Sequence, residues 1–216
     1  MNRGAVFRDR RDAGRQLAEA VDLLALDHPI VLALPRGGVP VGHEVARHLG
    51  APLEVFVVRK LGAPGQPEFG IGAIAEDGTS LVDDSSCRGL GVTRRQLDAI
   101  TATERDELQR RVARYRGDRA LPSVADRDVI VVDDGLATGV TARTALEALR
   151  RHHPRRLVLA VPVGAPETAA QVEDEGAEVV CLNRPSTFRS VGAWYQEFDQ
   201  ITDDEVLALL GRSPGG

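Results

Sequence analysis

Residues 128–142, DVIVVDDGLATGVTA, contain the pattern that most constrains the fold of this chain. The four β-branched residues at 129–132 predict a strand that is covered on both faces, as in a parallel sheet. Open α/β sheets bind ligands just beyond the carboxyl ends of their strands. The acids that follow, Asp133 and Asp134, are therefore expected at the lip of a cleft, where they can accept hydrogen bonds from ribose hydroxyls.

The loop after these acids is suited to hold a phosphate. It contains Ala137, Thr138, Gly139, Val140 and Thr141 and leads into a predicted helix. The first N–H groups of a helix lack intrahelical partners, glycine lets the backbone approach a ligand closely, and the threonines add hydroxyl donors. An ordinary turn with Asp and Thr caps is the alternative. We favour a ribose phosphate site because the acids, the glycine and both threonines occur together.

Two other nucleotide motifs do not fit. A Walker loop needs Gly-Lys-Ser/Thr, and residues 139–141 contain no lysine. Residues 70–75, GIGAIA, match the dinucleotide fingerprint, but they follow a Pro-rich loop and run into an Asp-Gly turn instead of opening a helix. We interpret that match as coincidence.

A second strand and turn lie earlier in the chain. Residues 30–34 are an apolar strand, and Pro35, Arg36, Gly37 and Gly38 lead from it into a helix. Exposed N–H groups of a Gly-rich turn form an anion nest, and a guanidinium offers a fork of donors to phosphate oxygens. A tight turn with a solvated arginine is the alternative.

Lysine usage gives a third candidate. Lys60 is the only lysine among 27 basic residues, and it follows Arg59 at the end of the predicted strand 53–58. An ammonium is a compact charge that can contact a single oxygen where a guanidinium is too wide. Chance placement of one lysine is the competing explanation.

The run of residues 128–142 resembles the signature of the type I phosphoribosyltransferases: an apolar strand, two acids, small or apolar residues, then Thr-Gly-x-Thr. The resemblance implies that Asp133 and Asp134 hold the 2′ and 3′ hydroxyls of phosphoribosyl pyrophosphate (PRPP). It also implies that the loop amides at 137–141 hold the 5′-phosphate. Val140 departs from the pattern, because many members have glycine there, and an inward side chain would narrow the site.

The same resemblance assigns a pyrophosphate site. The turn at Arg36, Gly37 and Gly38 is similar to the Ser-Arg-Gly-Gly loop of the xanthine-guanine enzymes, which often contains a non-proline cis peptide. An Arg-Lys pair like Arg59 and Lys60 contacts pyrophosphate in the adenine and orotate enzymes. We therefore expect these five residues to bind pyrophosphate.

These features do not identify the molecule that accepts the phosphoribosyl group. Leu-Ala-Thr-Gly at 136–139 is similar to adenine enzymes, whereas the turn at 35–38 is similar to xanthine-guanine enzymes. Segment 61–72 is expected to be the flexible loop of the family, with Glu68 near the acceptor base, although a solvated glutamate is the default. Phe188 and Trp194, in an aromatic-rich tail, are candidate base contacts from a variable hood, although such rings can equally pack the tail onto the body.

The whole chain of 216 residues, 43% of them hydrophobic, is long enough for one α/β core with a central mostly parallel sheet flanked by helices. We expect that core at 1–183, with a hood at 184–216. Helix, strand, helix and strand are predicted at 94–119, 157–163, 167–175 and 178–182. The apolar stripe of the first helix, Leu97, Ile100, Leu108 and Val112, could face the sheet or a second subunit of a homodimer.

Composition limits the partners. The net charge of −5 argues against general nucleic-acid binding, and no apolar run is long enough to cross a bilayer. The start of the chain is typical of an amphipathic helix and not of a signal peptide, which predicts a cytoplasmic location. Two isolated cysteines without metal-ligand spacing imply no bound transition metal.

These observations predict a Mg²⁺-dependent transfer of 5-phosphoribosyl from PRPP to a nitrogen acceptor, such as a nucleobase, with release of pyrophosphate. Asp133, Asp134, Lys60 and Arg36 are the candidate catalytic residues, and the two acids would meet Mg²⁺ only through water and PRPP. One alternative is a regulator of the same fold that senses PRPP or nucleotide without catalysis. Another is an enzyme with an amine as acceptor.

Overall fold

The body of the protein is a five-stranded parallel sheet in the order β2-β1-β6-β7-β8, seen in a computed structural model that describes residues 6–211. Strands β1 and β6 are buried along their whole length, as their apolar sequences predict. The predicted fold, an α/β core with a mostly parallel central sheet, is confirmed. The strands are β1 (Ile30–Ala33), β2 (Leu53–Val55), β6 (Asp128–Val132), β7 (Arg156–Val163) and β8 (Glu178–Asn183).

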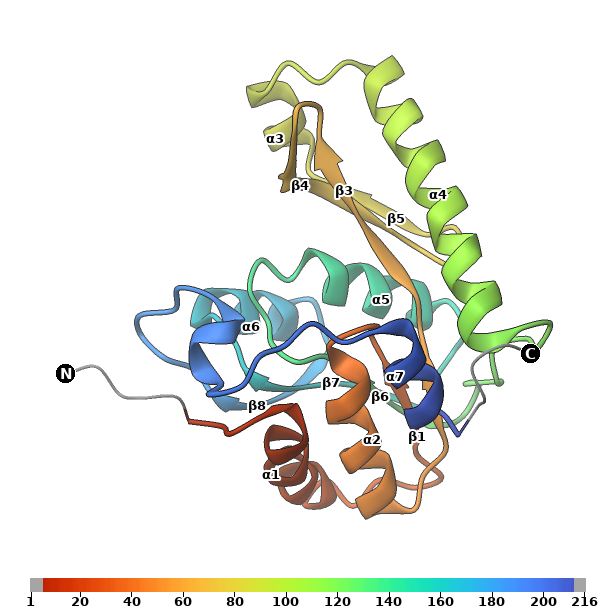
Figure 1. Ribbon diagram of the computed structural model, residues 1–216, viewed down its shortest axis with the longest axis vertical. Coiled ribbons are helices and arrows are strands. Elements are labelled where there is room, and N and C mark those ends of the chain that lie inside the picture. Colours follow the sequence, from red (N-terminus) through yellow and green to blue (C-terminus); the bar gives the residue numbers. More distant parts are fainter. Residues whose placement is uncertain (1–5, 212–216) are drawn as a thin grey trace.

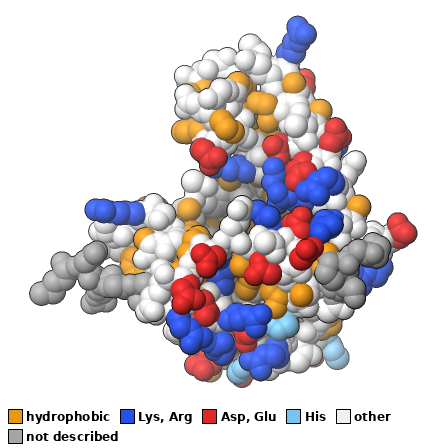
Figure 2. Space-filling model, viewed as in Figure 1, with side chains coloured by type: hydrophobic (Ala, Val, Ile, Leu, Met, Phe, Trp, Pro, Cys, Tyr) orange, Lys and Arg blue, Asp and Glu red, His pale blue; other side chains and the backbone are white. Residues whose placement is uncertain are grey.

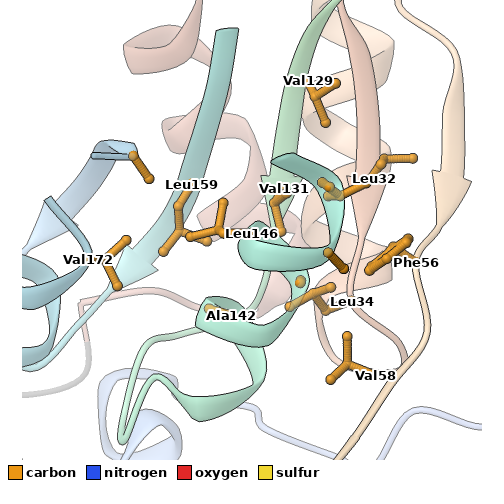
Figure 3. Packing of buried hydrophobic residues seen from close by; sticks show 14 of the residues in the cluster. Leu32, Leu34, Phe56, Val58, Val129, Val131, Ala142, Leu146, Leu159 and Val172 are labelled. Atoms are coloured by element: carbon orange, nitrogen blue, oxygen red, sulfur yellow. The ribbon is translucent and has the colours of Figure 1, made fainter. Parts of the chain in front are cut away.

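Two pairs of helices cover the two faces of this sheet (Figure 1). Helices α1 (Arg10–Asp22) and α2 (Gly38–Leu49) pack on one face. Helices α5 (Val140–Arg150) and α6 (Pro166–Asp174) pack on the other, where they cover alternate residues of β6 and β7 (Figure 3). Because successive strand residues point to opposite faces, one uninterrupted apolar strand supplies both halves of the core.

A second unit, the arm (residues 58–116), rises from the body (Figure 1). Its helix α4 packs against its sheet through Leu108, which is buried, and through the partly buried Leu97, Ile100 and Val112. The stripe therefore lies against the antiparallel sheet of the arm and not against the central sheet that the sequence suggested. The arm consists of β3 (Val58–Ala63), β4 (Gln66–Ala75), β5 (Ser80–Val82), α3 (Asp84–Gly89) and α4 (Arg94–Arg116).

One prediction about the arm was wrong in geometry. The predicted strand 53–58 is divided, because the chain leaves the parallel sheet after β2 and enters the antiparallel sheet as β3. Segment 61–72 lies in a two-stranded ribbon of β3 and β4, and its role as the flexible loop stays a prediction. Residues 70–75 lie within β4, so they do not form a turn that opens a helix, and the Asp77-Gly78 turn joins β4 to β5 in a hairpin.

A largely buried carboxylate, Glu76, joins the base of the arm to the body. The backbone N–H of Val57 donates to Glu76 Oε2 at 2.7 Å, and that of Glu76 donates to the Val57 carbonyl at 3.0 Å. Arg116, at the end of α4, pairs with the same carboxylate. Helix α4 stops there, three residues earlier than predicted, because Gly117 takes a positive φ of 61°.

The tail returns across the body as η1 (Val191–Trp194) and α7 (Asp203–Leu209). Tyr195 forms a β-bridge with Phe7, and its ring lies 5.4 Å from the Phe7 ring. Phe188 and Trp194 pack against the same small cluster. Thus the start of the described chain meets the first part of the tail beside the body.

Candidate functional site

The two acids and the Gly-Gly turn share one edge of the sheet. Ala33, the last residue of β1, pairs in register with Val132, the last residue of β6. The Leu34 N–H donates to the Val132 carbonyl at 2.8 Å, which continues this pairing by one residue. The turn after β1 and the acids after β6 are therefore neighbours, as expected for the carboxyl edge of a parallel sheet.

Contact between the turn and the acids is so close that only glycine fits. A Cβ on Gly37 would lie 2.0 Å from Asp134 Oδ2, and one on Gly38 would lie 2.5 Å from the Val132 carbonyl oxygen. Both distances are shorter than any ordinary nonbonded contact, so a side chain at either position would displace the acids or the turn. The peptide bond between Pro35 and Arg36 is cis.

Hydrogen bonds to β7 and α6 anchor the loop before α5. The N–H of Leu136 donates to the Val163 carbonyl at 2.8 Å, and Thr168 Oγ1 donates to the Ala137 carbonyl at 2.7 Å. Gly139 caps the helix with a positive φ of 72°. As at any helix start, the N–H groups that follow lack intrahelical partners, so the loop presents donors while its carbonyls are held.

Side chains in this loop leave space for a ligand. Ala137 and Thr138 are exposed, and Thr141 is partly exposed at the first turn of α5. Val140, the departure from the family pattern, packs against the core cluster beneath the helix.

Burial dominates the electrostatics of the acid pair. It raises the pKa of the Asp133 carboxyl well above its usual range, and the neighbouring charge of Asp134 raises it further. Burial also raises the pKa of Asp134, although Arg10 opposes this shift. Oδ1 of Asp133 accepts a hydrogen bond from the Asp134 backbone N–H at 2.8 Å. The pair is therefore a desolvated acceptor site whose charge is costly unless a partner compensates it.

Asp134 has two partners that the sequence did not reveal. Arg10 Nε donates to its Oδ2 at 2.8 Å, and the Tyr195 hydroxyl donates to its backbone carbonyl at 2.6 Å. Arg10 lies in the run RDRRD at 8–12, which reads as an ordinary charged helix start. Nothing local distinguishes it from its neighbours, because its partners are more than a hundred residues away.

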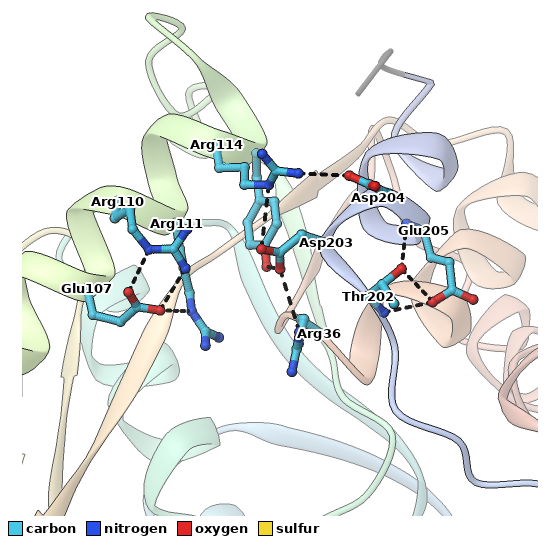
Figure 4. Close-up of polar contacts among 10 residues, drawn as sticks. Arg36, Glu107, Arg110, Arg111, Arg114, Thr202, Asp203, Asp204 and Glu205 are labelled. Atoms are coloured by element: carbon cyan, nitrogen blue, oxygen red, sulfur yellow. Dashed lines mark hydrogen bonds and ion pairs between the residues drawn. The ribbon is translucent and has the colours of Figure 1, made fainter. Parts of the chain in front are cut away.

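Arg36 points toward charged groups of the arm and the tail (Figure 4). Its Nη1 lies 3.8 Å from Asp203 Oδ1, the oxygen that also accepts a 2.5 Å hydrogen bond from the Tyr115 hydroxyl. Arg114 lies 3.5 Å from the other oxygen of that carboxylate. Asp203 therefore lies among cations from α4 and the Gly-Gly turn, and in Figure 2 acidic and basic side chains intermingle where the arm meets the body.

The sequence predicted Arg59 and Lys60 at the carboxyl edge of the parallel sheet. Both instead lie in β3 of the arm. Arg59 Nη2 lies 2.7 Å from Glu104 Oε2 on α4, and Lys60 Nζ donates to the Glu68 carbonyl at 2.6 Å. All four line a groove of about 670 Å³ between the hairpin and α4. No contact in the described part of the chain joins either cation to Arg36. The position differs from the prediction because the strand that carries these cations belongs to the other sheet.

The candidate acceptor contacts have ordinary structural surroundings. Glu68 is exposed on β4, and its backbone carbonyl, not its carboxylate, accepts the bond from Lys60. Phe188 and Trp194 are partly buried against Phe7, Val163 and Tyr195. These two rings help to pack the tail onto the body, and their role as base contacts stays a prediction.

Residues 6–211 contain neither a cluster of metal-ligating side chains nor a helix suited to span a membrane. No group of three or more His, Cys, Asp or Glu side chains gathers as a metal site within that range. None of its helices combines the length and the apolar character that a membrane span requires.

Together, the partly buried acids at a strand end, the close Gly-Gly turn and the open helix start define an α/β protein with a candidate ribose phosphate site. A family model described as "Phosphoribosyl transferase domain" matches residues 9–195. The chain belongs to this family, and its fold is that of the type I phosphoribosyltransferases.

Two relatives are similar along nearly the whole chain. A Mycobacterium tuberculosis protein named "Putative phosphoribosyl transferase Rv0571c" is 47% identical over 208 residues, which are 96% of this chain and 47% of that protein. The chain thus spans about half the length of this curated relative. The crystal structure of TT1426 from Thermus thermophilus has 46% identity and a TM-score of 0.79, covering 94% of this chain and 97% of that one.

A more distant structure shares the fold. A crystal structure of a hypothetical protein from Neisseria gonorrhoeae with bound ppGpp has a TM-score of 0.52 and 15% identity, covering 98% of this chain and 97% of that one.

Proposed function

We propose that this protein transfers the 5-phosphoribosyl group of PRPP to a nitrogen acceptor of the nucleobase class and releases pyrophosphate. One observation carries the proposal: Asp133 and Asp134 lie partly buried at the carboxyl end of β6, in contact with the Gly37-Gly38 turn and shortly before the start of α5. A sugar that carries a phosphate at one end and a pyrophosphate at the other suits this arrangement.

Each part of the site then has one task. Asp133 and Asp134 accept hydrogen bonds from the ribose hydroxyls and orient the sugar. The N–H groups and hydroxyls of loop 137–141 hold the 5′-phosphate at the helix start. The C1–O bond loosens to an oxocarbenium-like state, for which no protein nucleophile is needed. The chain contributes position and charge.

Charge on the leaving pyrophosphate is neutralised by the Gly-Gly turn and by the basic residues. Gly37 offers its backbone N–H there, while the Gly38 N–H already donates to the Leu34 carbonyl at 3.0 Å and Gly38 serves by letting the turn pack closely. Arg36, Arg59 and Lys60 supply full charges. Because Arg59 and Lys60 are paired within the arm, this role requires them to exchange their present partners for pyrophosphate oxygens.

Mg²⁺ fits this site as a partner of the substrate. Carboxylate oxygens are ligands that Mg²⁺ prefers, and it commonly keeps several waters and binds substrate phosphates. Asp133 and Asp134 would hold such waters beside the sugar, since residues 6–211 contain no cluster of three or more His, Cys, Asp or Glu that would hold the ion alone. When bound, Mg²⁺ supplies charge neutralisation to pyrophosphate and sugar oxygens.

A sensor of PRPP or nucleotide is the second candidate function. It is favoured by the pairing of Arg36 with Asp203 and of Arg59 with Glu104, which leaves the proposed pyrophosphate cations already neutralised. The Neisseria gonorrhoeae neighbour with bound ppGpp has the same fold, and we take from it only that a nucleotide is one ligand to test. The acidic net charge does not favour a nucleic-acid partner. A homodimer and a cytoplasmic location stay predictions.

Two measurements separate these functions. Calorimetry with PRPP and Mg²⁺ tests the site itself, and pyrophosphate release across purines, pyrimidines and ammonia tests catalysis. Release with one class of acceptor supports the enzyme and identifies that class, including the amine alternative. PRPP binding without release for any acceptor supports the sensor. Absence of PRPP binding contradicts the enzyme, and absence of both PRPP and nucleotide binding in the same calorimetry contradicts the sensor as well.

A further inference from the structure

Arg10 is a buried cation that reaches the ribose acids from outside the motif that carries them. It is the first residue of α1, and only 10% of its side chain is exposed. Its Nε donates to Asp134 Oδ2 at 2.8 Å, and its Nη1 donates to the Asp199 carbonyl at 2.7 Å. The guanidinium carbon lies 3.8 Å from the centre of the Phe198 ring. Two distant segments, the acid pair after β6 and the tail, therefore fix this one side chain.

The contact determines how Asp134 presents its oxygens. The bond from Arg10 engages Oδ2, the oxygen that also packs against Gly37. A carboxylate held at one oxygen by a fixed donor cannot turn freely, so Oδ1 keeps a defined direction as an acceptor. A directed bond from Nε therefore orients the acid as well as compensating its charge.

The tail completes the support of the same residue. The Tyr195 hydroxyl donates to the Asp134 carbonyl at 2.6 Å, and the Tyr195 and Phe198 rings lie 4.9 Å apart. Phe198 in turn stacks on Arg10. Asp134 is thus held by α1 on its side chain and by the tail on its backbone.

We propose that Arg10 is a positioning residue for PRPP. It holds Asp134 Oδ2 so that Oδ1 meets a ribose hydroxyl, and it acts only through that carboxylate. This inference rests on the proposed function, because it assigns the ribose hydroxyls to the acid pair. It adds that the start of α1 and the tail at 195–199 contribute to the affinity for the sugar, beyond the strand-and-loop motif.

The test compares two ligands on the same variants. PRPP carries the ribose hydroxyls, whereas inorganic pyrophosphate does not, so loss of sugar positioning weakens only PRPP. Calorimetry with Mg²⁺ is run on the wild type, Arg10→Met, Arg10→Lys and the control Arg11→Met. Methionine keeps an apolar contact with Phe198, lysine keeps the charge but not the directed Nε bond, and Arg11 is an exposed neighbour in the same helix.

We expect Arg10→Met to weaken PRPP binding about tenfold or more, the size of a lost hydrogen bond between charged groups, and to change pyrophosphate binding less than about twofold. Arg10→Lys should recover part of the loss, and Arg11→Met should bind as the wild type does. Unchanged PRPP affinity in Arg10→Met overturns the inference. So does an equal loss for both ligands, because that is the result of general structural damage. If the wild type itself does not bind PRPP, the proposed function fails and the role of Arg10 fails with it.

Discussion

The ribose end and the pyrophosphate end of the candidate site are built in different ways. At the ribose end the acids and the phosphate loop follow one another within residues 133–141, and the loop carries uncompensated donors. At the pyrophosphate end the cations come from a turn of the body and from the arm, and each is already paired with oxygen of this chain. The first end is organised before a ligand arrives, whereas the second must exchange partners.

This difference affects how much each end of the site contributes to the free energy of ligand binding. A site whose donors already face the ligand loses little free energy to reorganisation on binding. Cations that must first leave a carboxylate lose part of the free energy that they gain by binding pyrophosphate. The pyrophosphate site is therefore complete only after the arm and the tail have released these cations to the ligand. We therefore expect substitutions at the ribose end to have large effects on binding and those at the pyrophosphate end to have smaller effects.

The largest effect is expected from Gly37→Ala. The added Cβ would overlap Asp134 Oδ2 at 2.0 Å, so the turn or the acid must move. Calorimetry should show a loss of PRPP affinity of about a hundredfold, and overpacking should cost about 1–3 kcal/mol of stability in thermal unfolding. Gly89→Ala, where a Cβ meets nothing within 4 Å, is the matched control. Normal PRPP binding by Gly37→Ala would show that the turn and the acids do not act as one site.

Asp133→Asn should come next. The amide cannot accept ribose hydroxyls at both of its atoms, and loss of a hydrogen bond to a charged group corresponds to about 10- to 100-fold in kcat/KM for PRPP. Asp126→Asn, exposed near the other end of β6, controls for the change of charge. Unchanged kinetics in Asp133→Asn would remove the assignment of the ribose hydroxyls to this acid.

The arm is tested by a pair of substitutions. Arg59→Gln should lower kcat/KM for PRPP about tenfold if the guanidinium reaches pyrophosphate in the productive complex. Glu104→Gln removes the present partner at 2.7 Å and should leave this value unchanged or raise it. If both variants lose activity equally, the pair holds the arm together and Arg59 is not a ligand of pyrophosphate.

Lys60→Arg tests the need for a compact cation in steady-state assays. The variant keeps the charge, but the wider guanidinium cannot replace an ammonium at a single oxygen, so kcat should fall about fivefold. Stability should change little, since Lys60 bonds only a carbonyl of an exposed strand residue. An arginine variant with wild-type kcat would make the single lysine a coincidence.

Asp203→Asn should have the smallest effect and the opposite sign. Releasing Arg36 from a carboxylate 3.8 Å away should tighten PRPP binding about two- to threefold, because a partly exposed ion pair contributes at most about 1 kcal/mol. Asp204→Asn, which affects only the pair with Arg114, should bind PRPP as the wild type does. Weaker binding by Asp203→Asn would show that the pair orients Arg36 instead of competing for it.

The sequence by itself determined the parts of this protein that are local. Apolar runs predict the buried strands of the parallel sheet. Asp133, Asp134 and Gly139 follow β6 in an order that suggests a phosphate and sugar site from the sequence alone. The predicted strand and helix start are confirmed because they depend on residues adjacent in the chain, whereas the ligand roles of the acids stay predictions.

Tertiary structure alone decided which charges meet. The pairing of Arg10 with Asp134, of Arg36 with Asp203 and of Arg59 with Glu104 joins segments 45 to 167 residues apart. Among 59 charged residues, no local pattern marks these six, because long-range packing sets the partner of a charge and the side chain itself does not. The division of segment 53–63 between two sheets has the same origin, since both halves are equally suited to a strand and only the surrounding layers assign each half to its sheet.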